Sequence, residues 1–497
     1  MKEIINYFAE EFIYKLIDLK IGLYKEPEDL AGFIINVKKE TDELARRTIQ
    51  MVIQEMNEMI KNMPARKKKW YVERKGDPKI LTTSVGDIRF KKTLYESKEE
   101  VDENGKPIQC YLLDKVLGLQ PNQTMSEDAI KNILEETVQT SYRKGGKAAS
   151  PNGVTKGTVK DLLHSLKFPP NFKKPEVKRE VEYLYIEADE DHYHLQFQEH
   201  RGDLKTGKNG RKLNSAINKI IYVHEGIEPE APKSKRYKLI NTHYFCRGEE
   251  QDNKELWQEV FNYIESTYDI DKIKRMYLNS DGGPWIEAGR RGFAGVTFVL
   301  DEFHLEQYLN KLTGHMCDSQ NDAKDELREC IRNETKSCFY EVVEQLKGYT
   351  ELESVQEKID KAANYIANNW TAAKYRMKKV SGVIGSSTEG HVYHVLSSRM
   401  STQAMGWSRL GGSQMARLRE YYYNKGDMLE LAKYQREELP MAAGAEEVVL
   451  SASAMLRSER SKRTKEQMTY GKYATAMSGG LSMQNKKQLM FYLNGKI

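Results

Sequence analysis

The sequence has few of the features that mark secreted, membrane-spanning or zinc-stabilised proteins. Only five of its 497 residues are cysteines, and no two stand in C-x-x-C spacing, so neither disulfides nor a structural zinc site is expected. No apolar run approaches the roughly 18 residues that a membrane-spanning helix needs. Glu3, Glu10 and Glu11 interrupt the first residues, which a secretion signal would exclude. We therefore expect a soluble, cytoplasmic protein with no membrane partner.

Two widespread catalytic patterns are also absent. Residues 145–150 read GGKAAS, but the G-x-x-x-x-G-K-[ST] spacing of a P-loop is missing and no predicted strand precedes them. His391 and His394 lie three residues apart without the glutamate placement of an H-E-x-x-H zinc peptidase. Neither P-loop nucleotide hydrolysis nor zinc peptidase chemistry is expected.

The net charge is small, +5 from 78 Lys and Arg against 73 Asp and Glu. Affinity for a polyanion must therefore come from local clusters. Residues 201–238 hold ten Lys or Arg against four acids, and residues 455–497 hold nine against two. Such clusters neutralise phosphates with a salt-dependent affinity. Solvated loops can have the same composition.

Length and pattern predict a chain of several domains. The predicted segments are an N-terminal helical region (1–70), a β-hairpin segment (71–107), a helix-turn-helix-like DNA-binding domain (108–178), an α/β domain in two pieces (179–302 and 381–425), a helical insertion (303–380) and a basic tail (426–497).

The helix-turn-helix interpretation rests on two predicted helices and the polar loop between them. The first runs from the N-cap candidate Ser126 to a stop at Gly145 and Gly146, and Thr155 caps the second. Two such helices suit a DNA-reading hairpin. A plain helical linker domain has the same pattern.

From residue 180 onward, strands alternate with helices, which predicts a mixed sheet with helices packed on it. The expected strands are 183–188, 192–197, 219–224, 237–245, 275–279 and 295–300. After residue 423 the periodicity is lost.

Acidic residues stand where these strands end. Asp281 follows an apolar run and precedes Gly282 and Gly283, and Asp301 ends the next strand with His304 one helical turn on. Glu389 lies in the first turn of a late helix that also carries His391. Taken singly, a simple Asp-Gly turn is favoured for Asp281 and a helix cap for Asp301 over a functional role.

In the stretch VEYLYIEADEDHYHLQF (181–197), four of the five positions 187–191 are acidic. Strand alternation puts Glu187 and Asp189 on one face. We expect Asp189 to be the last strand position, with Glu190 and Asp191 in the turn that follows. Asp189 is the first candidate and Asp191 the reserve.

Together these acids suit a two-metal site. Mg²⁺ prefers carboxylate oxygen, and paired ions about 3.5–4 Å apart activate an attacking oxygen and steady the leaving one. Phosphodiester chemistry needs this because the substrate's negative charge repels a nucleophile. Asp189 and Asp281 would hold the metals, and Glu389 would complete the second site.

Four blocks, YIEADEDH, SDGGPWI, LDEFHLEQYL and EGHVYHVLSSRMSTQAMGWSR, resemble the DDE transposases of bacterial insertion sequences. The chain most resembles the ISLre-two family, long grouped as an uncharacterised protein family and related to the Mutator-like transposases. The resemblance runs from about residue 81 to about residue 419 and includes YLLDKVLGL before the helix-turn-helix.

The resemblance implies a ribonuclease-H-like catalytic domain with an all-helical insertion before the last carboxylate. It implies that Asp189, Asp281 and Glu389 bind two Mg²⁺ ions, which Mn²⁺ can replace. Asp301 and His304 match the Mutator-type C/D-x-x-H motif, which would place the histidine near the active site. The block ADED departs from the Asp-Gly more common in related families.

The predicted function is a transposase that binds terminal inverted repeats, cleaves DNA by two-metal hydrolysis and transfers the 3′-hydroxyl strand to target DNA. Its partner is double-stranded DNA, and oligomers on paired ends are expected. His304 would support orientation or the leaving group, with Asp301, Asp191 and His391 in supporting places. The alternatives are a catalytically inactive DNA-binding regulator derived from a transposase and a metal-dependent nuclease.

Overall fold

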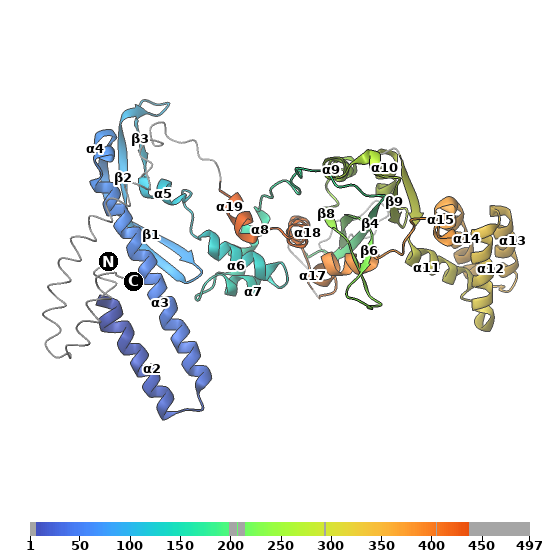
Figure 1. Cartoon of the computed structure of the whole chain (residues 1–497), viewed down its shortest axis with the longest axis horizontal. Coiled ribbons are helices and arrows are strands. Elements are labelled where there is room, and N and C mark those ends of the chain that lie inside the picture. Colours follow the sequence, from blue (N-terminus) through green and yellow to red (C-terminus); the bar gives the residue numbers. More distant parts are fainter. Residues whose placement is uncertain (1–5, 198–205, 207–213, 293–294, 404, 437–497) are drawn as a thin grey trace. The chain divides into compact units, whose positions relative to one another are not determined.

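The computed structural model describes residues 6–197, 206, 214–292, 295–403 and 405–436 (Figure 1). The chain divides into two compact units, which are described separately. Unit 1 comprises Met1–Ser126, Ser150–Asn152 and Arg436–Ile497, and unit 2 comprises Glu127–Ala149 and Gly153–Gln435. The bounds of the six predicted segments stay predictions.

Unit 1 joins long helices to a twisted β-hairpin. Its elements are η1 (Phe8–Phe12), α2 (Ile13–Lys25), α3 (Leu30–Asn62), α4 (Pro64–Lys69), β1 (Trp70–Thr83), β2 (Gly86–Val101), β3 (Pro107–Cys110) and α5 (Leu112–Leu117). The predicted helices and hairpin are confirmed, and the hairpin is longer than expected. Ile60 of α3, Trp70 of β1 and Phe90 of β2 lie in one buried core, which fixes the hairpin against α3.

Unit 2 begins with three short helices: α6 (Glu127–Thr137), α7 (Tyr142–Ala148) and α8 (Lys156–His164). Thr155 caps α8 as predicted, since its side chain accepts the N–H of Thr158. The prediction of one helix ending at Gly145 was wrong. The helix breaks at Ser141, which caps α7, and Gly145 lies inside α7, where a Cβ would meet Thr137 of α6. Gly145 is therefore a close-packing residue, not a stop.

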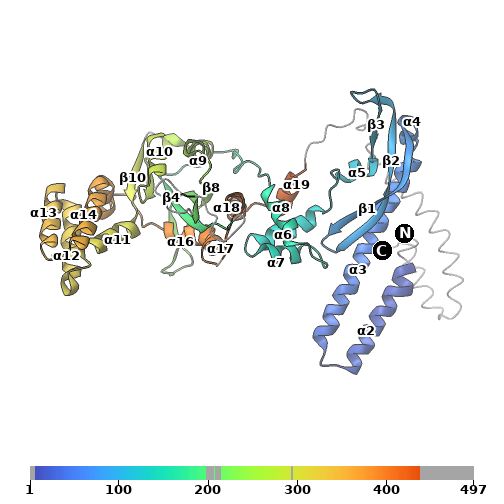
Figure 2. The ribbon, with the colours of Figure 1, turned by 180° about the vertical axis from the view of Figure 1, so that it is seen from behind.

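A five-stranded mixed sheet forms the centre of unit 2 (Figure 2). In the order β10-β9-β4-β5-β8, β4 pairs antiparallel with β5 and β5 with β8, whereas β9 pairs parallel with β4 and with β10. The strands are β4 (Tyr183–His194), β5 (Ser215–His224), β8 (His243–Gly248), β9 (Arg275–Ser280) and β10 (Val296–Leu300), beside a small ribbon of β6 (Ile227–Pro229) and β7 (Tyr237–Leu239). The predicted mixed α/β class is confirmed.

Two strand predictions were wrong. Residues 183–197 do not form two strands with a turn between them, because β4 is one strand that stays paired with β5 from Tyr185 to His194. Glu190 and Asp191, which were assigned to a turn, are strand residues paired with β5. Residues 237–245 divide into β7 and β8, with Asn241 at positive φ between them.

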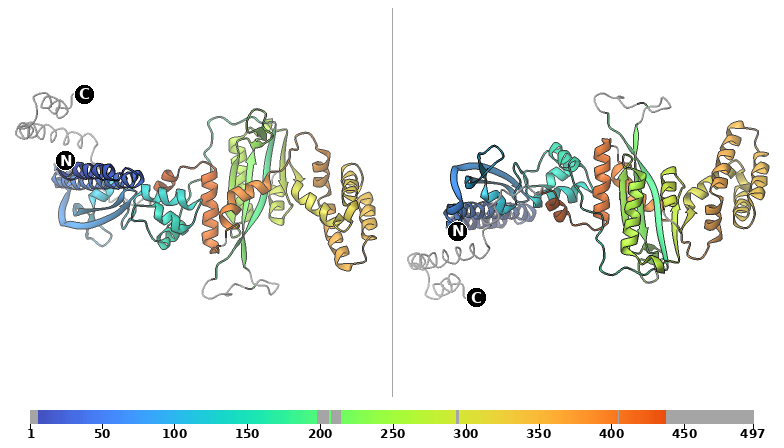
Figure 3. Two further views of the ribbon diagram at one scale, coloured as in Figure 1. Left: turned by 90° about the horizontal axis from the view of Figure 1, so that it is seen from below. Right: turned by 90° about the horizontal axis from the view of Figure 1, so that it is seen from above.

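Helices cover both faces of this sheet (Figure 3). On one face Leu184, Ile186 and Ala188 of β4 pack against Leu256 and Trp257 of α9 (Asn253–Thr267). α10 (Pro284–Gly292) packs on the same side and begins at Pro284 as predicted. The other face of β4 receives the chain that follows the insertion.

The segment after β10 is helical, as predicted, and it has its own core. Its helices are α11 (Glu302–Thr313), η3 (Cys317–Ser319), α12 (Gln320–Asn333), α13 (Lys336–Lys347), α14 (Glu353–Asn368) and α15 (Trp370–Lys378). Leu300 of β10 belongs to the same buried cluster as Leu327 and Phe339, so the insertion packs on the edge of the sheet.

Arg376 of α15 ties the insertion back to the sheet. Its buried guanidinium donates to the carbonyl of Leu300 at 3.0 Å, to Asn279 Oδ1 at 2.9 Å and to the carbonyl of Ile384 at 2.5 Å. One side chain thus links β9, β10 and the chain that leaves the insertion.

The remaining helices are α16 (Thr388–Val392), η4 (Tyr393–Ser397), α17 (Ser398–Met400), α18 (Arg409–Tyr423) and α19 (Met428–Tyr434). Helix α19 contradicts the prediction that periodicity is lost after residue 423, because Met428, Leu431 and Ala432 form its buried face. The basic tail from residue 437 on lies outside the described residues, as does the part of the predicted basic cluster (201–238) that falls in residues 201–205 and 207–213. In the described ranges, no helix is long and apolar enough to cross a membrane.

We expect Arg376→Ala to lower the free energy of unfolding by about 2–4 kcal/mol, because it removes charge-assisted hydrogen bonds and leaves buried acceptors unpaired. Urea denaturation followed by circular dichroism measures the change. The matched control is the exposed Lys378→Ala on the same helix, which should stay within about 0.5 kcal/mol of wild type. Equal midpoints for the two variants would contradict the assignment.

Candidate active site

Three aspartates lie in one row across the parallel strands. Glu187 of β4 pairs with Asn279 of β9, so Asp189 and Asp281 each follow that pair by two residues. Leu300 pairs with Ser280, so Asp301 and Asp281 each follow that pair by one residue. The carboxyl edge of parallel strands is where open α/β sheets place their ligands.

The position of Asp189 differs from the prediction. It is not the last residue of its strand, because it pairs with Ile220 of β5, and Glu190 and Asp191 continue that pairing with Lys219 and Asn218. Asp189 instead lies where the parallel partner β9 ends and the antiparallel partner β5 continues. Beyond Glu187, β4 has no pairing with β9, so the row of aspartates lies just past the end of the parallel pairing.

The four residues of β4 on this face have separable roles. Tyr185 donates its hydroxyl to the carbonyl of Gly382 at 2.7 Å. Asp191 accepts from Ser397 at 2.6 Å and from Ser401 at 2.8 Å. The Asp189 carboxylate accepts, from the described part of the chain, a single hydrogen bond, from its neighbour Glu190 N–H at 2.8 Å. Asp191 is therefore engaged in holding the late helix, and Asp189 keeps its acceptor capacity.

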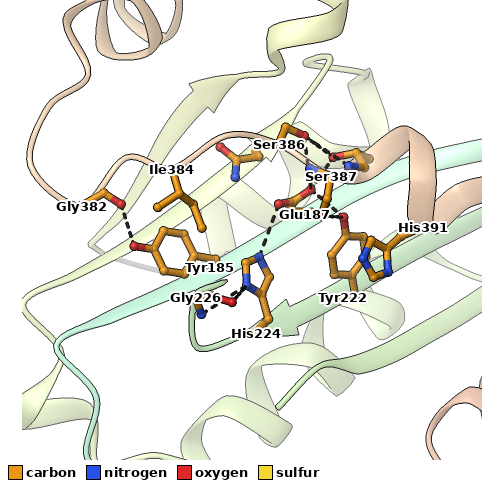
Figure 4. Close-up of polar contacts among 12 residues, drawn as sticks. Tyr185, Glu187, Tyr222, His224, Gly226, Gly382, Ile384, Ser386, Ser387 and His391 are labelled. Atoms are coloured by element: carbon orange, nitrogen blue, oxygen red, sulfur yellow. Dashed lines mark hydrogen bonds and ion pairs between the residues drawn. The ribbon is translucent and has the colours of Figure 1, made fainter. Parts of the chain in front are cut away.

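Glu187, the fourth residue, lies at the centre of a buried network (Figure 4). Tyr222 and Thr388 each donate a hydroxyl to its Oε2 at 2.6 Å, and the Ser387 N–H donates at 3.2 Å. His224 Nε2 lies 3.3 Å from Oε1. Burial alone would raise the pKa of Glu187, but these hydrogen bonds and the proximity of His224 lower it below its usual value.

Glu389 is exposed in the first turn of α16. Helix α16 continues through η4, a π-helical turn, into α17. π-Helical turns are often found at functional sites. Ser387 is the N-cap of α16, but its side chain makes no cap hydrogen bond. Glu187 from β4 accepts the Ser387 N–H instead.

Electrostatics link the three predicted carboxylates. The pKa of Asp189 is raised to about 7, chiefly by burial and then by the charges of Asp281 and Glu389, against the hydrogen bond from Glu190 N–H and the charge of His304. The fold thus brings Asp281, Glu389 and His304 within electrostatic reach of Asp189.

Asp301, the third aspartate of the row, forms a pair with His304. Asp301 caps α11 by accepting the His304 N–H at 3.0 Å, and its Oδ2 also lies 3.1 Å from His304 Nδ1. The hydrogen bond to Asp301 raises the pKa of His304, although burial opposes it, and the charges of Asp189 and Asp281 add to the rise. Asp301 therefore both caps the helix and orients the histidine.

The helical insertion adds two side chains that the sequence did not signal. Tyr365 of α14 donates its hydroxyl to the carbonyl of Asp281 at 2.5 Å, and its ring stacks on Tyr308 at 3.7 Å. Asn369 lies close to Gly282, whose φ of +83° suits glycine. Nothing in the local sequence distinguishes Tyr365 from an ordinary packing residue of a helix.

His391 is not part of the acidic row. Its Nδ1 lies 2.7 Å from the Tyr244 hydroxyl, and its ring lies 4.7 Å from that of Tyr222. Burial lowers the pKa of His391 to about 4, which keeps the ring neutral. It packs α16 onto the sheet.

As the side chains stand, no group of three or more His, Cys, Asp or Glu in the described residues could hold a metal ion. The chemistry of the row nevertheless suits a hard cation. All three predicted ligands are carboxylates, and Asp189 carries a charge that burial and two neighbouring carboxylates disfavour.

A family model described as "Uncharacterised protein family (UPF0236)" matches residues 26–437. The chain belongs to this family. One UPF0236 protein of Caldanaerobacter subterraneus subsp. tengcongensis is 34% identical over 430 residues, covering 86% of this chain and 85% of that protein. A second from the same organism is also 34% identical over 430 residues, covering 86% of this chain and 81% of that protein.

A third UPF0236 protein of that organism is 33% identical over 431 residues, with 86% of this chain and 85% of that protein covered, and its name joins eleven locus designations. Among solved structures, the Drosophila P element transposase strand transfer complex matches at a TM-score of 0.21 and 10% identity, covering 76% of this chain and 94% of that chain. A TM-score this low supports no conclusion about this UPF0236 chain.

The site predicts opposite effects on stability for two neighbouring acids. Asp191→Ala should lower the free energy of unfolding by about 1–3 kcal/mol, because Ser397 and Ser401 lose their acceptor. Asp189→Ala should leave it unchanged or raise it, because the substitution removes a buried charge near two others. Urea denaturation near pH 8 with a chelator measures both, above the Asp189 pKa of about 7. Equal losses would show that Asp189 is structural.

Proposed function

We propose that this UPF0236 protein is a DDE-type DNA transposase. The observation that carries the proposal is the placement of Asp189, Asp281 and Glu389, which lie 92 and 108 residues apart along the chain yet interact electrostatically. A binding protein gains nothing from gathering carboxylates where phosphates would approach, because like charges repel.

The sheet supports a ribonuclease-H-like catalytic domain. Three consecutive strands, β4, β5 and β8, are antiparallel, and β9 and β10 extend the sheet in parallel beyond β4. The helical insertion, α11–α15, lies between the Asp281 strand and the helix of Glu389. This is the arrangement that the resemblance implies.

The number of loci that share the name of one relative also supports the proposal. Its name joins eleven locus designations of one organism. A protein encoded at many positions in one genome is what a sequence that moves or copies itself would leave behind. For the present chain, inverted repeats flanking its reading frame would be the corresponding observation.

Asp189, Asp281 and Glu389 would hold two Mg²⁺ ions, and Mn²⁺ could replace them. When bound, such ions supply charge stabilisation and activation of the attacking oxygen. The chain contributes the rest. β4 and β9 hold the two aspartates in register, Tyr365 fixes the Asp281 backbone, and His304, oriented by Asp301, can hold a proton near the leaving oxygen.

The proposed substrate is double-stranded DNA, bound at the ends of the element by the N-terminal helices and by α7 and α8. In the first half of α8, Thr158 is partly exposed and Lys160 is exposed. The proposed reaction is hydrolysis at the element ends followed by transfer of the 3′-hydroxyl strand into target DNA, in the bacterial cytoplasm. A metal-dependent nuclease would stop after hydrolysis, and an inactive regulator would only bind.

Asp281→Ala and Glu389→Ala should each reduce end cleavage below detection while leaving DNA affinity unchanged. The expected loss is at least about 1,000-fold, because each removes a carboxylate that the transition state requires. Labelled end fragments incubated with Mg²⁺ or Mn²⁺ measure cleavage, and joined products separate a transposase from a nuclease.

The control for this experiment is Glu351→Ala, which removes an exposed carboxylate in the insertion. Cleavage by the Asp281 variant at the wild-type rate would overturn the assignment. Absence of cleavage by the wild-type protein, with binding intact, would favour the regulator.

We propose in addition that the protein self-associates, as paired ends require. Helix α2 has no buried residue, and it exposes Tyr14, Ile17, Ile21 and Tyr24. Their spacing of three, four and three residues is that of a coiled-coil seam. The order Tyr-Ile-Ile-Tyr reads the same in both directions, so an antiparallel second copy of α2 would place like side chains in register.

A double variant, Ile17→Glu with Ile21→Glu, should therefore convert the protein to a monomer, because it buries two charges in the seam. Light scattering coupled to gel filtration measures the mass. Asn36→Glu, an exposed change on α3, is the control and should leave the mass unchanged. A wild-type protein that is already monomeric without DNA would refute self-association through α2.

A further inference from the structure

Glu187 is a buried carboxylate that the proposed chemistry does not use. It has no exposed surface, and it lies two residues before Asp189 on the same face of β4. A buried charge is tolerated only where partners compensate for its lost hydration. The partners of Glu187, and the segments to which they belong, therefore indicate the role of this carboxylate.

Both oxygens of Glu187 are engaged. Oε2 accepts from Tyr222, Thr388 and the Ser387 N–H, with the Ser386 hydroxyl at 3.3 Å, and Oε1 faces His224. Tyr222 and His224 come from β5, whereas residues 386–388 lead directly into α16. The side chain that shares a strand face with Asp189 is thus not available as a ligand, and it ties the start of α16 to β4.

The next residue after Thr388 is Glu389. The Ser387 N–H is one of the unpaired backbone donors at the start of α16, and a carboxylate there also opposes the partial positive charge of the helix end. Since Ser387 itself makes no cap hydrogen bond, Glu187 takes the place of a local cap. A local cap would hold the helix start only to its own turn, whereas Glu187 holds it to the strand that carries Asp189.

Neighbouring anchors do not share this role. Tyr185 binds the carbonyl of Gly382, seven residues before Glu389, and Tyr277 binds the carbonyl of Ser381 at 2.7 Å. Asp191 binds Ser397 and Ser401, more than two helical turns after Glu389. Glu187 is the anchor beside the catalytic glutamate.

We propose that Glu187 is a positioning residue that fixes Glu389 relative to Asp189 through the Ser387 N–H and the Thr388 hydroxyl. The inference rests on the proposed function, because it assigns to Glu389 a place in the metal site. It adds that the last carboxylate is placed by a buried acid of the first strand. Loss of Glu187 should weaken cation binding without removing a ligand.

The test is Mn²⁺ binding by the full-length chain without DNA, measured from the electron paramagnetic resonance signal of free Mn²⁺. Glu187→Ala should weaken binding by at least about tenfold, equivalent to 1.4 kcal/mol. Glu187→Gln, which keeps an acceptor oxygen for Ser387 and Thr388, should recover most of that loss. Tyr185→Phe is the matched control: it removes an anchor on the same strand face and should leave Mn²⁺ affinity unchanged.

Hydrogen–deuterium exchange of residues 387–392 gives a second readout that needs no metal. The amides there should exchange at least about tenfold faster in Glu187→Ala than in wild type or Tyr185→Phe, because the helix start opens locally. Thr388→Val, which removes one donor, serves in place of Glu187→Ala if circular dichroism shows that the alanine variant is unfolded, and it should shift both readouts in the same direction.

The outcomes separate the two proposals. Wild-type Mn²⁺ affinity and unchanged exchange in a folded Glu187→Ala or Thr388→Val variant would overturn the positioning role and leave the metal site intact. If wild type binds no Mn²⁺, or Asp281→Ala binds it as tightly as wild type, the proposed metal site fails, whereas faster exchange in the Glu187 variant would still support positioning of α16.

Discussion

The structure of unit 2 depends on the buried charge of Glu187. A carboxylate with no exposed surface must be matched by donors, and here the donors come from β5 and from residues 386–388, which follow the insertion. This interaction ties together chain segments separated by some two hundred residues. Arg376, Tyr185 and Tyr277 hold the preceding residues to the same sheet. The long helical insertion can therefore leave the sheet and return without displacing the helix that carries Glu389.

One face of β4 combines residues that hold the structure together with one carboxylate that does not. Hydrogen bonds to the segments packed on this face engage the Tyr185 hydroxyl, Glu187 and one oxygen of Asp191. The Asp189 carboxylate accepts, within the described residues, only from Glu190 N–H. The raised pKa of Asp189 follows, because a partly buried carboxylate with two other carboxylates nearby has little to compensate its charge.

Much of the fold could be predicted from residue pattern. Apolar alternation found the strands of the sheet, the three-to-four residue spacing found the helices, and Pro284 marked the start of α10. The errors share a cause. Glu190 and Asp191 were assigned to a turn after the strand, yet pairing with Lys219 and Asn218 of β5 keeps both in the strand. Gly145 was taken as a helix stop, but contact with Thr137 requires a glycine inside α7. In both cases a partner distant in sequence overrode the local preference.

The sequence by itself determined the types of element, the acids at the ends of the parallel strands and the membership of the UPF0236 family. Only the tertiary structure decided which acid does what. The sequence alone does not distinguish the roles of the four acids in positions 187–191. Strand alternation places Glu187 and Asp189 on the same face and so cannot assign them different roles. The distinction comes from partners that lie on β5 and beyond the insertion, because hydrogen bonds between distant segments exist only once the chain has folded. Hydrogen bonds to residues 387–388 make Glu187 an anchor, and those to Ser397 and Ser401 make Asp191 a second one. Asp189 accepts, within the described residues, a single hydrogen bond, from its neighbour Glu190.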